Sequence, residues 1–123
     1  MMTISIGQKL LDWNRKHLLA EGELTTEMIA ECFDSELTVV ANGRRYETDL
    51  AGYLAFLNGF RQTIRQIDYE VLHEISEGHK TVLGMRAFVD RISGKQDQFE
   101  AMLLLEFNDA QKIKLWHEVY IEL

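Results

Sequence analysis

The fold is decided by four runs in the second half of the chain: IDYEVLHEISE (residues 67–77), KTVLGMRAFVDRI (80–92), QFEAMLLLEFN (98–108) and KIKLWHEVYIEL (112–123). Each run is rich in β-branched or aromatic residues, or alternates apolar and polar ones, as strands do. The turn-like segments EGH (77–79) and SGKQ (93–96) separate the first three runs. Together they predict a meander of four long strands.

The chain before residue 66 predicts mainly helices. Residues 6–20 carry an amphipathic stripe at three- or four-residue spacing, formed by Ile6, Leu10, Trp13 and His17. Thr25 or Thr26 is expected to cap a second, shorter helix, and Thr48 or Asp49 a third. Residues 36–41 and 44–47 read as two short strands joined by a turn at residues 42–43. This order of elements predicts a curved sheet laid over helices, and therefore a fold of the α+β class.

Composition limits what the protein can be. At 123 residues the chain is long enough for one domain, residues 1–123, with one core. The net charge of −7 argues against nucleic acid as a partner, because binding a phosphate backbone needs a concentrated positive face. No apolar run reaches the roughly 18 residues of a membrane span, so no membrane partner is expected. Residues 1–7 lack the pattern of a secretory signal, and a cytoplasmic location is expected.

Alternation gives each strand two faces. Tyr69, Val71, His73 and Ile75 share one face of the first long strand in this pattern. In the next two strands the row opposite the inner one is not wholly polar, since it contains Phe88, Met102 and Leu104. Those side chains would be stranded in water on a monomer, so we expect a homodimer that pairs through the outer sheet face.

Two motifs add a family resemblance. EGHKTV (residues 77–82) is similar to an acid-Gly-Asp-x-Val strand turn, and KIKLWHEV (112–119) is similar to a closing Gly-x-Ile-x-Glu-His-Trp-Asp-Val strand. Both patterns belong to the nuclear transport factor 2-like superfamily, and to its SnoaL-like polyketide cyclase branch in particular. The order of elements resembles that superfamily over nearly the whole chain.

The resemblance implies a cone-shaped barrel: a mostly antiparallel sheet wrapped round about three helices, with a pocket at its wide end. It also implies dimerisation through the outer sheet face. Members include cyclases, isomerases, dehydratases and epoxide hydrolases, while others only bind a ligand or a protein. Fold alone therefore does not decide the chemistry.

Glu118 falls where the cyclase-like pattern has its acid–base aspartate. A carboxylate facing an apolar pocket has a raised pKa, which suits it to moving a proton near neutral pH. Polarity alone gives the opposite orientation, because Ile113, Leu115, Val119 and Ile121 look like an inward row. In that case His117 would be the polar group in the pocket. Both orientations stay open at this point.

Other candidates come from residue type. His73 is a second catalytic candidate if it lies close to Glu118, and otherwise a hydrogen-bonded core residue. Four aromatic side chains are either pocket walls or ordinary core: Trp13, Tyr53, Trp116 and Tyr120. Leu103 and its row predict an apolar lining where cyclase-like relatives place polar groups. His117 and Trp116 also stand in exchanged order relative to the family pattern.

We expect no metal and no other cofactor. The four histidines are scattered and form no ligand spacing, and Cys32 is a lone, core-type cysteine. Two functions fit. The first is a small-molecule pocket protein, with acid–base catalysis by Glu118 on an apolar, carbonyl-bearing ligand and Tyr120 or His73 on its oxygen. The second is a non-catalytic dimeric module that binds a ligand or a protein.

Overall fold

The structure is a computed structural model that describes residues 5–123. Its elements follow the chain in this order: α1 (Ile6–His17), α2 (Thr26–Ile29), β1 (Phe33–Ala41), β2 (Arg44–Asp49), α3 (Leu50–Arg61), β3 (Ile64–Glu77), β4 (Lys80–Arg91), β5 (Gln96–Phe107) and β6 (Ile113–Glu122). All four long strands, the first hairpin and the three helices were predicted. The prediction that residues 1–7 lack a secretory-signal pattern includes residues 1–4, which lie outside the described residues.

Local side-chain chemistry explains where the helices begin. Ser5, Thr25 and Asp49 are the N-caps of α1, α2 and α3. The Asp49 carboxylate, for example, accepts a hydrogen bond from the Gly52 N–H at 2.8 Å. Each cap satisfies a backbone donor that has no partner inside the helix.

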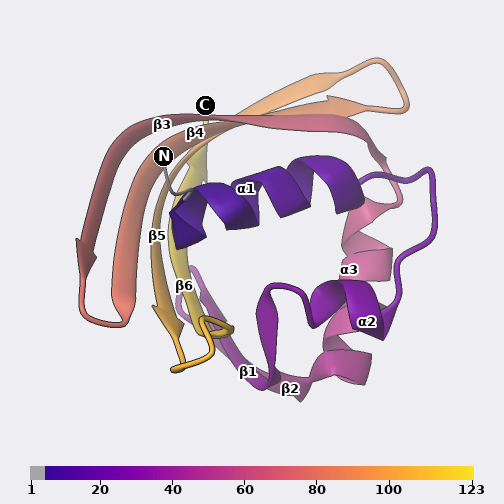
Figure 1. Ribbon diagram of the computed structural model, residues 1–123. Coiled ribbons are helices and arrows are strands. Elements are labelled where there is room, and N and C mark those ends of the chain that lie inside the picture. Colours follow the sequence, from indigo (N-terminus) through magenta and orange to yellow (C-terminus); the bar gives the residue numbers. More distant parts are fainter. Residues whose placement is uncertain (1–4) are drawn as a thin grey trace, which may run out of the picture.

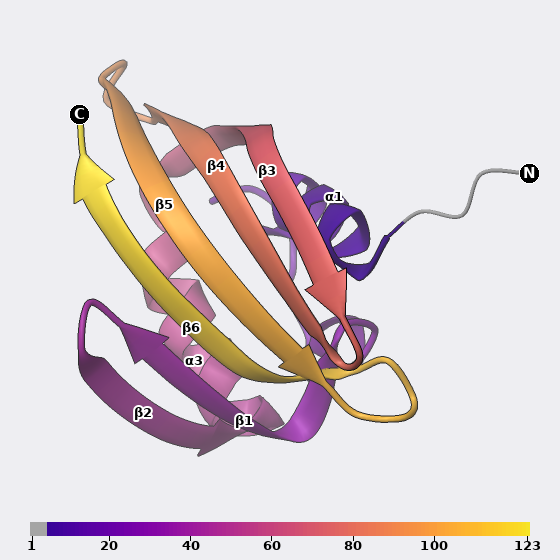
Figure 2. The same cartoon turned by 90° about the vertical axis from the view of Figure 1, so that its left-hand side faces the viewer.

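The six strands form one sheet in the order β2-β1-β6-β5-β4-β3. Neighbours are antiparallel except β1 and β6, which run parallel. The sheet is strongly curved and stays open, because its edge strands β2 and β3 do not pair with each other (Figures 1 and 2). The predicted α+β cone is confirmed in this form.

The helices lie on the concave side of the sheet. Figure 1 shows β3, β4 and β5 bending over α1, while α2 and α3 close the opposite side of the interior. The most deeply buried side chains come from α1, α2 and the strands, and include Leu10, Leu11, Ile29, Phe33, Ile64, Leu83, Leu103, Leu105 and Ile113. Cys32 lies in this core, as predicted, and burial raises the pKa of its thiol.

Two of the register shifts in the sheet decide which side chains near the candidate site face the helices. The β3–β4 pairing shifts between Val71 and His73, so Leu72 is an extra residue. The β5–β6 pairing shifts between Glu106 and Phe107, so Lys114 is an extra residue in β6. An extra residue in one strand of a pair reverses the inward and outward alternation beyond it.

Candidate functional site

The concave side of the sheet holds a cavity of about 350 Å³. Its walls are mainly apolar and aromatic, and they come from α1, α3 and five strands. The principal lining residues are Asn14, Val39, Tyr53, Phe56, Phe60, Tyr69, Met85, Ala87, Arg91, Phe99, Ala101, Trp116, Glu118 and Tyr120. A concave, apolar site with few polar groups is the usual form of a small-molecule site.

Glu118 points into this cavity. On β6 it pairs with Leu103, a fully buried residue of the inner row, and so shares its face. Burial raises the pKa of the Glu118 carboxyl to about 6, and a side-chain hydrogen bond from Trp116 offsets part of that rise. The inward row of β6 is therefore Trp116, Glu118 and Tyr120.

The inward row that polarity favoured for β6 is wrong. Val119 and Ile121 are 57% and 59% exposed on the convex face, together with His117. The reason is the extra residue Lys114: it leaves Ile113 inside, as predicted, but turns Leu115 and every second residue after it outward. His117 therefore does not enter the cavity.

His73 does not lie near Glu118. It pairs with Gly84, whose Cα faces the convex side, whereas Tyr69 and Val71 pair with the inner-row residues Ala87 and Met85. The extra residue Leu72 separates the two halves of the row that was predicted to share one face. Glu118 and His73 thus lie on opposite faces of the sheet, and no proton relay connects them directly.

The aromatic candidates divide into two groups. Tyr53, Trp116 and Tyr120 line the cavity. Trp13 is core instead: it is buried, packs edge-on against Phe33 and donates its indole N–H to the Met28 carbonyl at 2.9 Å. Leu103 faces inward, but it is fully buried and contributes nothing to the cavity wall.

Two of the three tyrosines that line the cavity with Glu118, Tyr53 and Tyr69, have buried hydroxyl groups. Burial raises the pKa of both Tyr53 and Tyr69 well above the ordinary value, and the Glu118 charge adds to the rise in each. The three groups therefore lie within electrostatic reach of one another. Tyr69 also accepts a hydrogen bond from Asn14 Nδ2 at 3.1 Å. A carboxyl that exchanges protons, beside neutral hydroxyl donors, can move a proton on a ligand and stabilise charge on its oxygen.

The cavity wall continues into aromatic side chains of α3. Tyr53 stacks on Phe56 and Phe56 on Phe60, with ring centroids 5.9 and 6.5 Å apart and rings nearly parallel. Phe56 and Phe60 are 48% and 46% exposed although both line the cavity. They therefore mark its open side. Phe56 was not identified from the sequence as a wall residue, although its three-residue spacing from Tyr53 on one helix would have found it.

Asn14 and Tyr69 were also missed as a pair. Tyr69 was placed on a row with His73, and Asn14 received no role. The available signal was Asn14 itself, a polar side chain beside the apolar stripe of α1.

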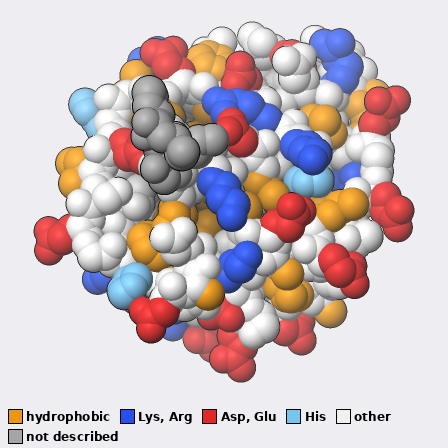
Figure 3. All heavy atoms as spheres, viewed as in Figure 1, with side chains coloured by type: hydrophobic (Ala, Val, Ile, Leu, Met, Phe, Trp, Pro, Cys, Tyr) orange, Lys and Arg blue, Asp and Glu red, His pale blue; other side chains and the backbone are white. Residues whose placement is uncertain are grey.

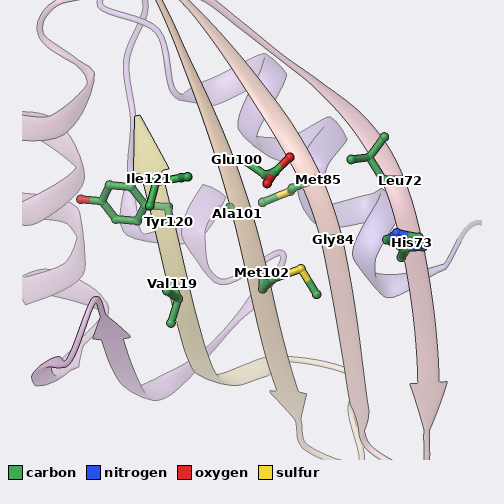
Figure 4. Close-up of a pocket in the computed structure, with 10 residues that line it drawn as sticks. All are labelled: Leu72, His73, Gly84, Met85, Glu100, Ala101, Met102, Val119, Tyr120 and Ile121. Carbon is green, nitrogen blue, oxygen red and sulfur yellow. The ribbon is translucent and has the colours of Figure 1, made fainter. Parts of the chain in front are cut away.

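The convex side carries a second, shallower hollow of about 330 Å³. Figure 4 shows His73, Met102 and Val119 around it, while the Tyr120 ring extends away from these side chains. The hollow is lined mostly by apolar groups and by backbone at Gly84. Its carboxyl group, on Glu100, is half exposed and lies beside Arg86, unlike the buried Glu118 carboxyl of the concave cavity.

Charged side chains and possible metal ligands among residues 5–123 are the remaining candidates for a site. Acidic and basic side chains are interspersed over the face shown in Figure 3. Within residues 5–123, no three His, Cys, Asp or Glu side chains are grouped so as to hold a metal ion. In the same part of the chain, no helix has the length and apolar character needed to cross a membrane.

The comparisons with known proteins rest on structure. No family model and no curated protein matches the sequence. The chain is similar to a candidate isomerase from Rhodopseudomonas palustris, with a TM-score of 0.78, 13% identity, and coverage of 97% of this chain and 91% of that one. It is also similar to a candidate polyketide cyclase from Acidithiobacillus ferrooxidans, with a TM-score of 0.75, 16% identity and coverage of 98% and 91%.

A third similar structure carries the name of the fold in its own description. A nuclear transport factor 2-like protein from Anabaena variabilis has a TM-score of 0.75 at 14% identity, with coverage of 98% of this chain and 95% of that one. The protein therefore has the nuclear transport factor 2-like fold, as the two sequence motifs predicted. At these identities the likeness extends to the fold and not to the chemistry.

Proposed function

We propose that the protein binds a small, largely apolar, carbonyl-bearing molecule in the concave cavity and that Glu118 moves a proton on it. The reaction class is an isomerisation or cyclisation through an enol or enolate. Glu118 takes a proton from a carbon next to the carbonyl group and returns it at another position. The cavity walls hold the apolar body of the ligand and keep water away.

The observation that carries this proposal is the environment of Glu118. Its carboxyl faces an apolar cavity, and its pKa is raised to about 6 by burial. Near neutral pH both the ionised and the protonated form are then populated. A group in this state serves as base in one step and as acid in the next.

The fold comparisons support the reaction class without fixing it. A candidate isomerase and a candidate polyketide cyclase share the fold of this chain. Both names describe reactions that move protons or close rings on small molecules. The assignment to the SnoaL-like branch stays part of this proposal.

Proton transfer can be tested without knowing the natural substrate. The probe is 2-acetylnaphthalene, whose methyl protons lie next to a carbonyl and exchange with deuterium when a base removes them. We expect the protein in D₂O to accelerate this exchange, measured by mass spectrometry. Glu118→Gln should reduce the acceleration by a factor of roughly 100 or more, because general-base catalysis commonly contributes that much.

The matched control is Glu100→Gln. Glu100 lies on the convex side of β5, where its carboxylate is 3.5 Å from the Arg86 Nε, so it faces away from the cavity. The Glu100→Gln variant should therefore exchange the probe's methyl protons at the wild-type rate. Exchange that persists in Glu118→Gln, with circular dichroism showing an intact fold, would remove Glu118 as the proton carrier.

A second candidate function is a dimeric module that binds without catalysis, and the convex face favours it. Exposed apolar side chains lie there on β3, β5 and β6: Leu72, Ile75, Met102, Val119 and Ile121. Arg86 and Glu100 lie among them as an opposite-charge pair. A second copy of this chain, related by a two-fold axis, fits this face because each copy offers the same apolar surface and both charges.

Sedimentation velocity tests the homodimer. We expect a dimer at micromolar concentration and a monomer for Met102→Asp, because a buried aspartate would have no partner in the interface. Ile92→Asp is the control, since Ile92 is equally apolar and exposed but follows the end of β4 at the β4–β5 turn. A wild-type protein that sediments as a monomer would contradict the homodimer.

A further inference from the structure

Tyr69 is held by two consecutive residues of α1. Asn14 Nδ2 donates to the Tyr69 hydroxyl oxygen at 3.1 Å, and Arg15 Nη2 donates to the Tyr69 backbone carbonyl at 3.2 Å. The Arg15 guanidinium also lies 5.6 Å from the centroid of the Tyr69 ring. Arg15 is itself fixed by Asp68 and Asp12, each at 2.7 Å. The position of the Tyr69 ring is therefore determined at both its ends.

Asn14 needs an explanation beyond packing. Its side chain is only 2% exposed, on a helix whose other buried side chains are mainly apolar. Burying an amide costs free energy unless its donors and acceptor find partners, and a leucine would fill the same space without that cost. The amide lines the cavity and bonds to a hydroxyl that lines the same cavity.

In this hydrogen bond the Asn14 amide is the donor and the Tyr69 oxygen is the acceptor. Because the Tyr69 oxygen accepts from the Asn14 N–H, the hydroxyl proton of Tyr69 points elsewhere. The cavity that both residues line also contains the Glu118 carboxyl. Burial keeps the pKa of Tyr69 far above neutral, so the hydroxyl stays protonated and remains a donor.

We infer that the Tyr69 hydroxyl is the hydrogen-bond donor for the ligand oxygen, and that Asn14 is the positioning residue that presents it. This inference rests on the proposed function. When Glu118 removes a proton from the carbon next to the carbonyl, the C–H electron pair forms a C=C bond. The carbonyl π pair then moves to the oxygen, where Tyr69 stabilises the charge without giving up its proton.

A pair of matched probes isolates the donor from turnover. 2-Acetylnaphthalene and 2-isopropenylnaphthalene have nearly the same shape, but only the first carries an acceptor oxygen. We expect the wild-type protein to bind the ketone roughly two- to tenfold more tightly, since that range corresponds to one net hydrogen bond. The carbonyl stretching frequency of the bound ketone should also fall below its value in an apolar solvent.

Tyr69→Phe should abolish the ketone preference and restore the higher carbonyl frequency, while binding of the hydrocarbon stays the same. Asn14→Leu should reduce both signals because the hydroxyl loses its orientation. Asn14→Asp should reduce both signals further, because a carboxylate at this position accepts a hydrogen bond from the Tyr69 hydroxyl and so turns its proton away from the ligand. Tyr46→Phe is the control: Tyr46 lies outside the cavity, and its hydroxyl is 3.3 Å from Thr48 Oγ1.

Each remaining outcome is decisive. A ketone preference that survives Tyr69→Phe, or that is lost in Tyr53→Phe instead, overturns the inference even if deuterium exchange depends on Glu118. A preference that depends on Tyr69 while Glu118→Gln leaves exchange unchanged supports the donor and overturns only the catalytic role. Failure of both naphthalenes to bind overturns the inference together with the proposed pocket.

Discussion

The side-chain amide of Asn42 pairs with both backbone polar groups of Tyr120. Nδ2 donates to the Tyr120 carbonyl at 3.1 Å, and Oδ1 accepts from the Tyr120 N–H at 2.8 Å. The Asn42 backbone N–H also donates to the Glu118 carbonyl at 2.9 Å. Asn42 thereby continues the β1–β6 pairing beyond Ala41 and fixes the part of β6 that carries Glu118 and Tyr120.

Substitutions at Asn42 should separate this bridge from the turn. Asn42 and Gly43 both have positive φ, at 50° and 85°. Asn42→Gly keeps that backbone conformation and loses two hydrogen bonds, so we expect the free energy of unfolding to fall by about 1–2 kcal/mol. Asn42→Ala should cost about 1 kcal/mol more, because alanine tolerates positive φ poorly. Urea unfolding measures both.

Two outcomes would contradict this account of Asn42. If Asn42→Gly is as stable as the wild type, the bridge to Tyr120 contributes nothing. If the glycine and alanine variants are equally destabilised, the turn conformation has no cost for a side chain with a Cβ.

The raised pKa of Glu118 makes stability depend on pH. The pKa of this carboxyl is ordinarily 4.5 and rises to about 6 in the fold. The folded state therefore holds this proton more tightly than the unfolded state does. The stabilisation that this proton gives the folded state is present in full below pH 4.5 and is lost as the pH rises through about 6. Above that range, the Glu118 carboxyl no longer makes the free energy of unfolding depend on pH.

Glu118→Gln removes this titration, so comparison with the wild type isolates it. From about pH 4 to about pH 8, we expect the variant to gain up to ~2 kcal/mol in free energy of unfolding relative to the wild type. Urea unfolding at both pH values gives this difference, while the other carboxylates titrate in both proteins and cancel. A difference that does not change with pH would mean that the Glu118 carboxyl is solvated.

Most of the fold could be predicted from the sequence because its signals are local. The turn at Asn42 and Gly43 and the cap at Asp49 each depend on side chains a few residues away. The inner rows of β4 and β5 were also predicted correctly, because Met85 and Leu103 lie in strands whose mutual pairing has no shift. Alternation read from the sequence then matches the sheet directly.

The candidate site could be predicted only in part, because it depends on register. One extra residue, Leu72, places His73 on the convex face, and another, Lys114, turns Glu118 inward against the polarity of its strand. Neither residue is a glycine or another usual marker of a bulge. The orientation of Glu118 in the structure agrees with the family resemblance, not with periodicity. The contact between Asn14 and Tyr69 joins residues 55 positions apart, and no local pattern indicates it.

A contrast between two apolar residues tests which part of the interior is a site and which part is core. Leu103 is fully buried and does not line the cavity, whereas Phe56 is half exposed and does. Leu103→Ala should lower the free energy of unfolding by about 2–5 kcal/mol, because it leaves a void in packed core. Binding of 2-acetylnaphthalene by the molecules that remain folded should be unchanged.

Phe56→Ala should give the opposite result. Its ring stacks on Tyr53 and Phe60 at the open side of the cavity. Its loss therefore removes contact area for the ligand, but it exposes little additional apolar surface to water because the ring is already half exposed. We expect a stability change below ~1 kcal/mol, as for most exposed positions, and a several-fold weaker binding of the probe. Fluorescence titration and urea unfolding of the two variants give all four values. Probe binding that weakens in Leu103→Ala and not in Phe56→Ala would place the ligand away from the α3 wall and against the inner row of β5.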